Sequence, residues 1–181
     1  MSIADLWLPI LVSAIIVFVV SALVWMVLPW HRSDFRKLPD EESLRGILRG
    51  LGAGCYTVPY CTDPAELKDE TMQKKYIEGP LAFITIGQNG LPRMGPKLAA
   101  SFGYYVAVGI ACAYMVSRTL SAETPYLEVF RIAGTTAFLA YGIAYVQDSI
   151  WFSRPWSLTA KNVLDALIYA LLTGGAFGWL V

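Results

Sequence analysis

The feature that most constrains this chain is a run of residues near its start that holds no charged side chain. Residues 6–30 read LWLPILVSAIIVFVVSALVWMVLPW. A helix needs about 20 predominantly apolar residues to cross about 30 Å of hydrocarbon, so this run is long enough to span a bilayer. Only 15% of the whole chain is charged, against about 25% in soluble domains, which also points to lipid-facing surface.

The same run could instead belong to a signal peptide. The first residues, MSIADLW, carry the acidic Asp5 and no basic residue, and no small-residue cleavage site follows the apolar stretch. Both features differ from the basic, cleavable pattern of a secretory signal. We therefore expect a retained transmembrane helix.

Three further apolar stretches are long enough to form spans, at about residues 98–117, 127–147 and 159–180. The fold class predicted from them is an all-α membrane protein, a four-transmembrane-helix bundle with a small cytoplasmic α+β insertion between helices 1 and 2. The first helix is expected within residues 1–30, the insertion at residues 31–97, and helices 2–4 within residues 98–181.

The distribution of basic residues predicts the topology. Ten of the fourteen Lys and Arg residues lie between residues 31 and 97, whereas only Arg118 and Arg131 fall on the opposite side. The positive-inside rule therefore places residues 31–97 in the cytoplasm and both termini outside. The formal net charge of zero argues against nucleic acid as a partner, because no excess of basic residues is available to contact phosphates.

The insertion is predicted to hold two helices and a short pair of strands. Leucine and isoleucine repeat at helical spacing from Leu44 to Leu51. This helix either packs on the rest of the insertion or lies on the inner leaflet with Arg45 and Arg49 among lipid phosphates. A second helix is expected at about residues 64–77, and residues 81–87 are expected to pair as a strand with CYTVPYC.

Cys55 and Cys61 are the residues of the insertion that most resemble a chemical site. In an extended strand they would lie about 20 Å apart, whereas the Cα atoms of a disulfide lie within about 7 Å. Five residues separate them and the chain holds no second Cys or His pair, while zinc sites favour shorter spacings and four ligands. We therefore expect structural cysteines, no metal and no cofactor. A redox or metal role shared with another chain is the alternative.

Aromatic and basic residues near the ends of the spans are expected at the membrane interface. His31 is the only histidine and is interpreted as an interfacial anchor, with haem or metal ligation alongside a partner as the alternative. Asp148 and Arg154 are expected to pair. The predicted interface residues are Trp30, His31, Arg32, Trp151, Phe152, Arg154 and Trp156.

Asp165 is the one acidic residue expected well inside a span, because Lys161 can extend to the interface. Three roles are open for Asp165: a local pair with Lys161 four residues earlier, a pair with another helix, or a proton or substrate site. In the last case Thr135 and Thr136 of the third span are the expected companions.

Small residues in the spans allow close contact between helices. Gly174 and Gly178 form a GxxxG pattern, and Ala107 and Ala111 form a weaker small-xxx-small pair. Both patterns fit packing within the bundle as well as between subunits. No P-loop, GxGxxG, GxSxG, HExxH or CxxC motif occurs, so we expect no catalytic residues.

Three stretches carry a resemblance to known proteins: VWMVLPWHRSDFRKLPDEE, YTVPYCTDP and AYGIAYVQDSIWFSRPWSLTAKNVLDALIYALLTGGAFGWL. They resemble a group of small bacterial inner-membrane proteins with four predicted helices, and the resemblance extends over nearly the whole chain. It implies a multi-pass protein of the bacterial inner (cytoplasmic) membrane with periplasmic termini. It carries no catalytic or binding residue across.

The function expected from the sequence is that of a non-enzymatic integral membrane protein, an accessory or assembly subunit of a homo-oligomer or of a larger membrane complex. The expected partners are membrane lipids and either further copies of the chain or other membrane subunits. The alternatives are a small transporter or channel that uses the intramembrane Asp165, and a lipid-binding or lipid-modifying protein that uses the stretch from Trp151 to Trp156.

Overall fold

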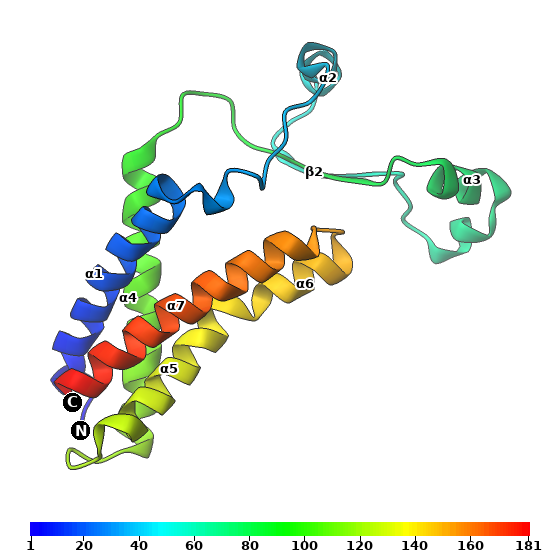
Figure 1. The fold of residues 1–181 in the computed structure, drawn as a ribbon. Coiled ribbons are helices and arrows are strands. Elements are labelled where there is room, and N and C mark those ends of the chain that lie inside the picture. The colour runs from blue at the N-terminus through cyan, green and yellow to red at the C-terminus, as the bar shows by residue number, and fades with distance from the viewer. The chain divides into compact units, whose positions relative to one another are not determined.

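The computed structural model describes all 181 residues, and they form two compact units (Figure 1). The first unit comprises Met1–Phe35 and Arg93–Val181. The second, which we call the insertion, is Arg36–Pro92. The insertion therefore begins and ends about five residues inside the segment 31–97 expected from the sequence, and residues 31–35 belong to the helical unit.

Four long helical segments make up the first unit. Each is long and apolar enough to cross a membrane: Ala4–Val27, Met94–Thr119, Tyr126–Trp151 and Trp156–Leu180. The four spans expected from the sequence are confirmed at this level. The elements within them are the 3-10 turn η1 (Ala4–Leu6), α1 (Trp7–Ala22), the π-helical turn η2 (Leu23–Val27), α4 (Met94–Thr119), α5 (Tyr126–Gly142), α6 (Ala144–Trp151) and α7 (Trp156–Leu180).

The core of this unit is built mainly from small side chains. The alanines Ala14, Ala113, Ala133 and Ala137 are fully buried. The last three pack in one cluster with buried valines and Phe177. Small residues let helix backbones approach closely, so that dispersion contacts between the backbones hold the helices together. Figure 1 shows α1 beside α4 and α5 beside α7.

Two glycines of α7 lie in its contact with α5. A Cβ atom at Gly174 would lie 2.9 Å from the carbonyl oxygen of Phe130, and one at Gly178 would lie 2.8 Å from the ring of Tyr126. Real Cβ atoms do not approach this closely, so both positions need glycine. The GxxxG pattern therefore serves packing between two helices of the same chain.

The other small-residue pattern is not used in this way. Ala107 and Ala111 of α4 are both exposed, so they contact no other helix of this chain closely. The adjacent face of α4 packs instead, where a Cβ atom at Gly109 would lie 3.1 Å from the side chain of Ile10. The sequence shows small residues on two faces of α4 and does not say which one is covered.

The insertion contains a two-stranded antiparallel sheet of β1 (Gly54–Val58) and β2 (Ala82–Ile86), in which Cys55 lies opposite Thr85. The expected strand pair is confirmed. The strand β1 ends before Pro59, which cannot donate a hydrogen bond to a sheet. Before the sheet, α2 (Glu41–Leu48) begins at Asp40, whose carboxylate accepts a hydrogen bond from the Ser43 amide at 3.1 Å.

The helix expected at residues 64–77 is divided in two. The 3-10 turn η4 (Pro64–Lys68) and α3 (Glu70–Glu78) are separated by Asp69, whose backbone is extended. The Asp69 carboxylate accepts a hydrogen bond from the Met72 amide, so this residue begins a new helix instead of continuing the first. The prediction of one continuous helix is wrong because Asp69 caps more favourably than it propagates.

The insertion buries very little of itself. Pro59 is its only buried residue, and no residue of α2 is buried. Ile47, on the apolar side of α2, is 74% exposed. Leu44 and Leu48 of the same stripe are half-buried. The stripe is therefore covered only in part, because a segment of this size encloses too little volume to form a core.

The cysteines of the insertion are free thiols. Cys61 donates a hydrogen bond to the carbonyl of Asp63 at 3.2 Å. Burial and the neighbouring carboxylate of Glu66 raise the pKa of the Cys61 thiol, which keeps it protonated and poorly nucleophilic. No group of three or more His, Cys, Asp or Glu side chains is placed to hold a metal ion.

The α5–α7 contact gives a direct test of the helix packing. Replacing Gly174 by Ala should lower the melting temperature of the detergent-solubilised protein, because overpacking typically costs about 1–3 kcal/mol and outweighs a gain in helix propensity of up to about 1 kcal/mol. The matched control is Gly175→Ala on the same helix, where the nearest atom to the new Cβ would be 3.9 Å away. Equal melting temperatures for the two variants would contradict the close contact.

Candidate functional site

The chain that leaves α1 folds back on itself. The π-helical turn η2 ends at Val27, Leu28 is extended, and the 3-10 turn η3 (Pro29–His31) follows. Single π-helical turns occur frequently at functional sites. Here the turn brings the imidazole of His31 onto the ring of Trp25, with centroids 3.8 Å apart and an interplanar angle of 1°.

His31 lies between two carboxylates. Its Nδ1 is 2.5 Å from Oδ2 of Asp34, and its Nε2 is 2.8 Å from Oδ2 of Asp165 in α7. The three side chains are 5%, 2% and 5% exposed, respectively. The sequence groups His31 with the interfacial anchors, whereas the structure buries it as the link between the end of the first span and the fourth.

Lys161 completes the cluster. Its ammonium group donates to Oδ1 of Asp34 at 2.5 Å, to the carbonyl oxygen of Trp30 at 2.8 Å and to the hydroxyl of Ser33 at 3.0 Å. The local pair of Lys161 with Asp165 is not formed. We call residues 29–34 the η3 segment. Three acceptors on it satisfy the three N–H groups of Lys161, and Asp165 is bonded by His31 instead.

The charge of Asp34 follows from its partners. Burial acts to raise the pKa of this carboxyl, but hydrogen bonds from Lys161 and His31 outweigh it, and the net effect is a lowered pKa. Asp34 is therefore an ionised carboxylate at neutral pH, held by one cation and by the Nδ1–H of His31.

The geometry around His31 requires one more proton than a neutral imidazole carries. A neutral imidazole has a single N–H, and both ring nitrogens face carboxylate oxygens within hydrogen-bond distance. Since Asp34 is ionised and takes the Nδ1–H, the contact of Nε2 with Asp165 needs a second proton. That proton lies either on Nε2 or on the Asp165 carboxyl, so the two groups share a site for an exchangeable proton.

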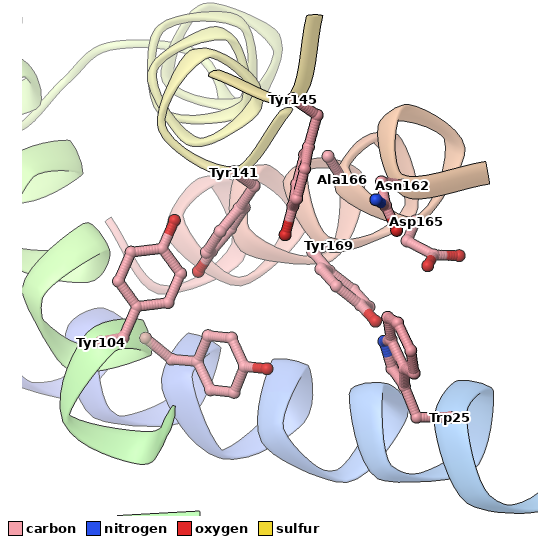
Figure 2. A pocket seen from close by; sticks show the side chains of 9 residues that line it. Trp25, Tyr104, Tyr141, Tyr145, Asn162, Asp165, Ala166 and Tyr169 are labelled. Carbon is pink, nitrogen blue, oxygen red and sulfur yellow. The ribbon is translucent and has the colours of Figure 1, made fainter. Parts of the chain in front are cut away.

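A cavity of about 90 Å³ opens beside Asp165. Figure 2 shows Asp165 at one edge of it, with the hydroxyl ends of Tyr141 and Tyr145 pointing into the space between the helices. The second carboxylate oxygen of Asp165, Oδ1, is buried and has no hydrogen-bond partner. The full lining is Trp25, Tyr104, Tyr105, Tyr141, Tyr145, Asn162, Asp165, Ala166 and Tyr169.

Four of the lining tyrosines form a cluster of rings drawn from three helices. The ring centroids of Tyr105 and Tyr141 are 6.1 Å apart, and those of Tyr141 and Tyr169 are 5.9 Å apart, both in edge-to-face geometry. Tyr104 contacts Tyr105 and Tyr141 in the same range and donates its hydroxyl hydrogen to the carbonyl of Ala140. Edge-to-face contacts of this kind are favourable beyond area burial and fix the shape of the cavity wall.

The threonines expected to accompany Asp165 do not reach it. Thr135 is exposed on α5, and neither threonine lines the cavity. Thr136 donates its hydroxyl hydrogen to the carbonyl of Ile132 at 2.8 Å, within its own helix. The polar partner of Asp165 is instead His31 of η3.

The aromatic stretch between α6 and α7 lies on the surface of this unit. The side chains of Trp151, Phe152 and Trp156 are 70%, 56% and 60% exposed. Arg154 donates to Oδ2 of Asp148 at 2.8 Å, which confirms the predicted pair. The exposed aromatic rings fit the interfacial role expected for them, and that role stays a prediction.

Sequence reasoning missed Asp34 and the tyrosines. A signal was present for one of the tyrosines, because Asp165 and Tyr169 are four residues apart in α7 and lie on one helix face. Comparison with protein-family models, with curated proteins and with solved structures finds no match to this chain. The chemistry of the site therefore follows from the geometry of its own residues.

The ionised state of Asp34 predicts a pH dependence of stability. Its pKa is lowered on folding, so its contribution is present above the ordinary value of 3.8 and is lost as the pH falls through the folded-state pKa. Asp34→Asn should therefore lower the melting temperature at neutral pH, with the difference from wild type shrinking below about pH 4. Thermal unfolding in detergent over a pH series measures this.

Glu123→Gln is the control for that series, because Glu123 is an exposed acid in the turn between α4 and α5. It should leave the melting temperature within error at every pH. A loss in Asp34→Asn that stays constant down to pH 3 would show that the carboxylate charge is not what stabilises the cluster.

Proposed function

We propose that this chain is a multi-pass protein of the bacterial inner membrane, with its four long helical segments as spans, the insertion in the cytoplasm and both termini in the periplasm. Apolar side chains on the outside of the helices support this, among them Trp7 (61% exposed) and Val19 (51% exposed). The concentration of Lys and Arg between residues 31 and 97 supports the orientation. Because the number of spans is even, the two termini lie on one side (Figure 1).

We further propose that the protein is a small transporter or channel that takes up and releases a proton at the His31–Asp165 pair. The observation that carries this is the double contact of His31, whose two ring nitrogens lie 2.5 and 2.8 Å from carboxylate oxygens. Ionisable residues inside spans commonly form proton relays, and histidine is the side chain that changes charge nearest neutral pH.

Lys161 and Asp34 have separate roles beside the His31–Asp165 pair. Lys161 keeps Asp34 ionised, so Asp34 holds the Nδ1–H of His31 in place and leaves Nε2 for exchange. When the shared proton departs to water in the cavity, a lone pair of Nε2 faces the Asp165 carboxylate. These two acceptors repel at 2.8 Å. Loss of the proton therefore breaks the His31 contact with α7, while Lys161 still holds the η3 segment, so proton release is coupled to a local movement of Asp165 away from His31.

Other groups facing the pair do not supply a competing charge. On α7 these are Lys161, which is engaged by the η3 segment, and the phenol of Tyr169. Tyr145 of α6 and the tyrosines of α4 and α5 are uncharged at neutral pH. Trp25 covers one face of the imidazole.

The test is proton flux into liposomes. Reconstituted protein in vesicles that contain a pH-sensitive dye, with a potassium gradient and valinomycin, should admit protons at a rate that depends on pH. Asp165→Asn should reduce the rate to that of empty vesicles, because the amide cannot exchange a proton. Asp148→Asn, which removes an acid paired at the surface with Arg154, should retain the flux.

His31→Gln is the second variant, for use if Asp165→Asn does not fold. The glutamine amide can donate a hydrogen bond to Asp165 but cannot exchange a proton as an imidazole does. Wild-type protein with no flux above that of empty vesicles would refute the proposal. So would a folded His31→Gln or Asp165→Asn variant that conducts protons normally.

The accessory or assembly role remains a second candidate, and one observation favours it. The insertion leaves large apolar side chains uncovered: Ile77 is 84% exposed and Leu91 is 92% exposed. Exposed apolar patches mark contact with protein or membrane, and α2 with its arginines fits the inner leaflet.

Purification from native membranes in a mild detergent tests this role. The protein should co-purify with a partner chain or form a homo-oligomer. Ile77→Glu or Leu91→Glu should disrupt that assembly. A stable monomer with no accompanying chain would count against an assembly role.

A further inference from the structure

The cavity beside Asp165 has the electrostatic character of a cation site. Its only ionisable group other than tyrosine is Asp165, whose Oδ1 is buried without a partner. No basic side chain lines it, because Lys161 is occupied by Asp34, Trp30 and Ser33. An unpaired carboxylate oxygen in a buried cavity favours a positively charged hydrogen-bond donor and disfavours an anion.

The wall of the cavity adds a second and independent preference. Six aromatic side chains line it: Trp25, Tyr104, Tyr105, Tyr141, Tyr145 and Tyr169. Aromatic faces attract cations, and cages of such rings recognise methylated ammonium groups. These rings come from five elements, η2, α4, α5, α6 and α7 (Figure 2).

The cavity is large enough for a small organic ion. Its volume of about 90 Å³ is several times the roughly 10–15 Å³ that one water needs on the same measure. An ammonium group with one or a few methyl or methylene carbons fits this space. The amide of Asn162 and the tyrosine hydroxyls provide further oxygen acceptors for its N–H groups.

We propose that this cavity binds a small organic ammonium group, whose N–H donates to Oδ1 of Asp165 while its carbons contact the aromatic rings. The consequence of this binding rests on the proposed function. The ammonium ion and the shared proton both neutralise the charge of Asp165, so they compete. A bound cation therefore favours loss of the proton from the His31–Asp165 pair, and protonation favours release of the cation. Linkage makes the two effects equal in size.

The ammonium group has two possible sources. It is either a free amine of about the size of methylamine or the headgroup of an aminolipid such as phosphatidylethanolamine. Both present the same chemistry to Asp165 and the rings. Experiments with and without the lipid separate them.

The binding experiment is equilibrium dialysis of radiolabelled methylammonium against the whole protein in detergent micelles, at constant ionic strength set with sodium chloride. Binding should saturate at one ion per chain and strengthen as the pH rises from 6 to 8. Asp165→Asn should abolish it. Tyr145→Phe, which keeps the ring, should bind within about two-fold of wild type, and Tyr145→Leu should bind about 2- to 30-fold more weakly, the range of one cation–π contact.

Tyr145 suits this comparison because it is only half-buried and lies outside the buried core, so both variants should fold. The single histidine supplies the second readout: ¹⁵N NMR of His31 should show loss of a ring N–H as methylammonium is added at fixed pH. In nanodiscs without added amine, phosphatidylethanolamine should produce the same change if the lipid headgroup is the source, and phosphatidylglycerol should not.

The outcomes separate this inference from the proposed function. Saturable binding of methylammonium, or a response of His31 to the aminolipid, supports the ammonium site. No binding from either source, or equal binding to Tyr145→Phe and Tyr145→Leu, overturns the site while leaving proton flux untouched. Binding that is retained while His31 and flux show no pH dependence overturns the coupling and the proposed function, and leaves the site.

Discussion

The structure depends on how four ionisable side chains satisfy one another where little water reaches them. Asp34 and Asp165 are almost fully buried carboxylates, and His31 lies between them. An unpaired buried charge costs several kcal/mol, so each carboxylate needs a donor within reach. Lys161 and Asp165 are one turn apart on α7, and His31 and Asp34 are three residues apart on the segment after α1. The two pairs therefore fasten that segment to α7.

The same requirement explains the irregular backbone after α1. A regular helix continuing past Ala22 would carry His31 away from α7, since each residue adds 1.5 Å along the axis. The π-helical turn η2, the extended Leu28 and the turn η3 reverse the chain instead. The carbonyl of Trp30, left without a helical partner by this reversal, accepts a hydrogen bond from Lys161. The reversal also stacks Trp25 on His31 and places it in the cavity wall.

The sequence predicts the four long helices, the strand pair and the pair of Asp148 with Arg154, because each depends on local pattern or short separation. It does not predict the cluster, because His31 and Asp165 are far apart in the chain and nothing local relates them. The tyrosines were not predicted as site residues, because a tyrosine within an apolar span is scored as one more hydrophobic residue. The continuous helix at residues 64–77 failed for a local reason, the capping tendency of Asp69, which outweighed helical periodicity.

A cluster that served only to fasten two segments would have a different composition. Replacing buried ion pairs by apolar side chains of similar volume is often neutral or stabilising, and protein interiors seldom leave space unfilled. Here Oδ1 of Asp165 has no partner, and the adjoining cavity remains open although large aromatic side chains surround it. Buried polar groups without partners are rare and call for an explanation. These costs coincide at the one group that shares a proton with His31, which is the arrangement that the proposed proton and ammonium exchange requires.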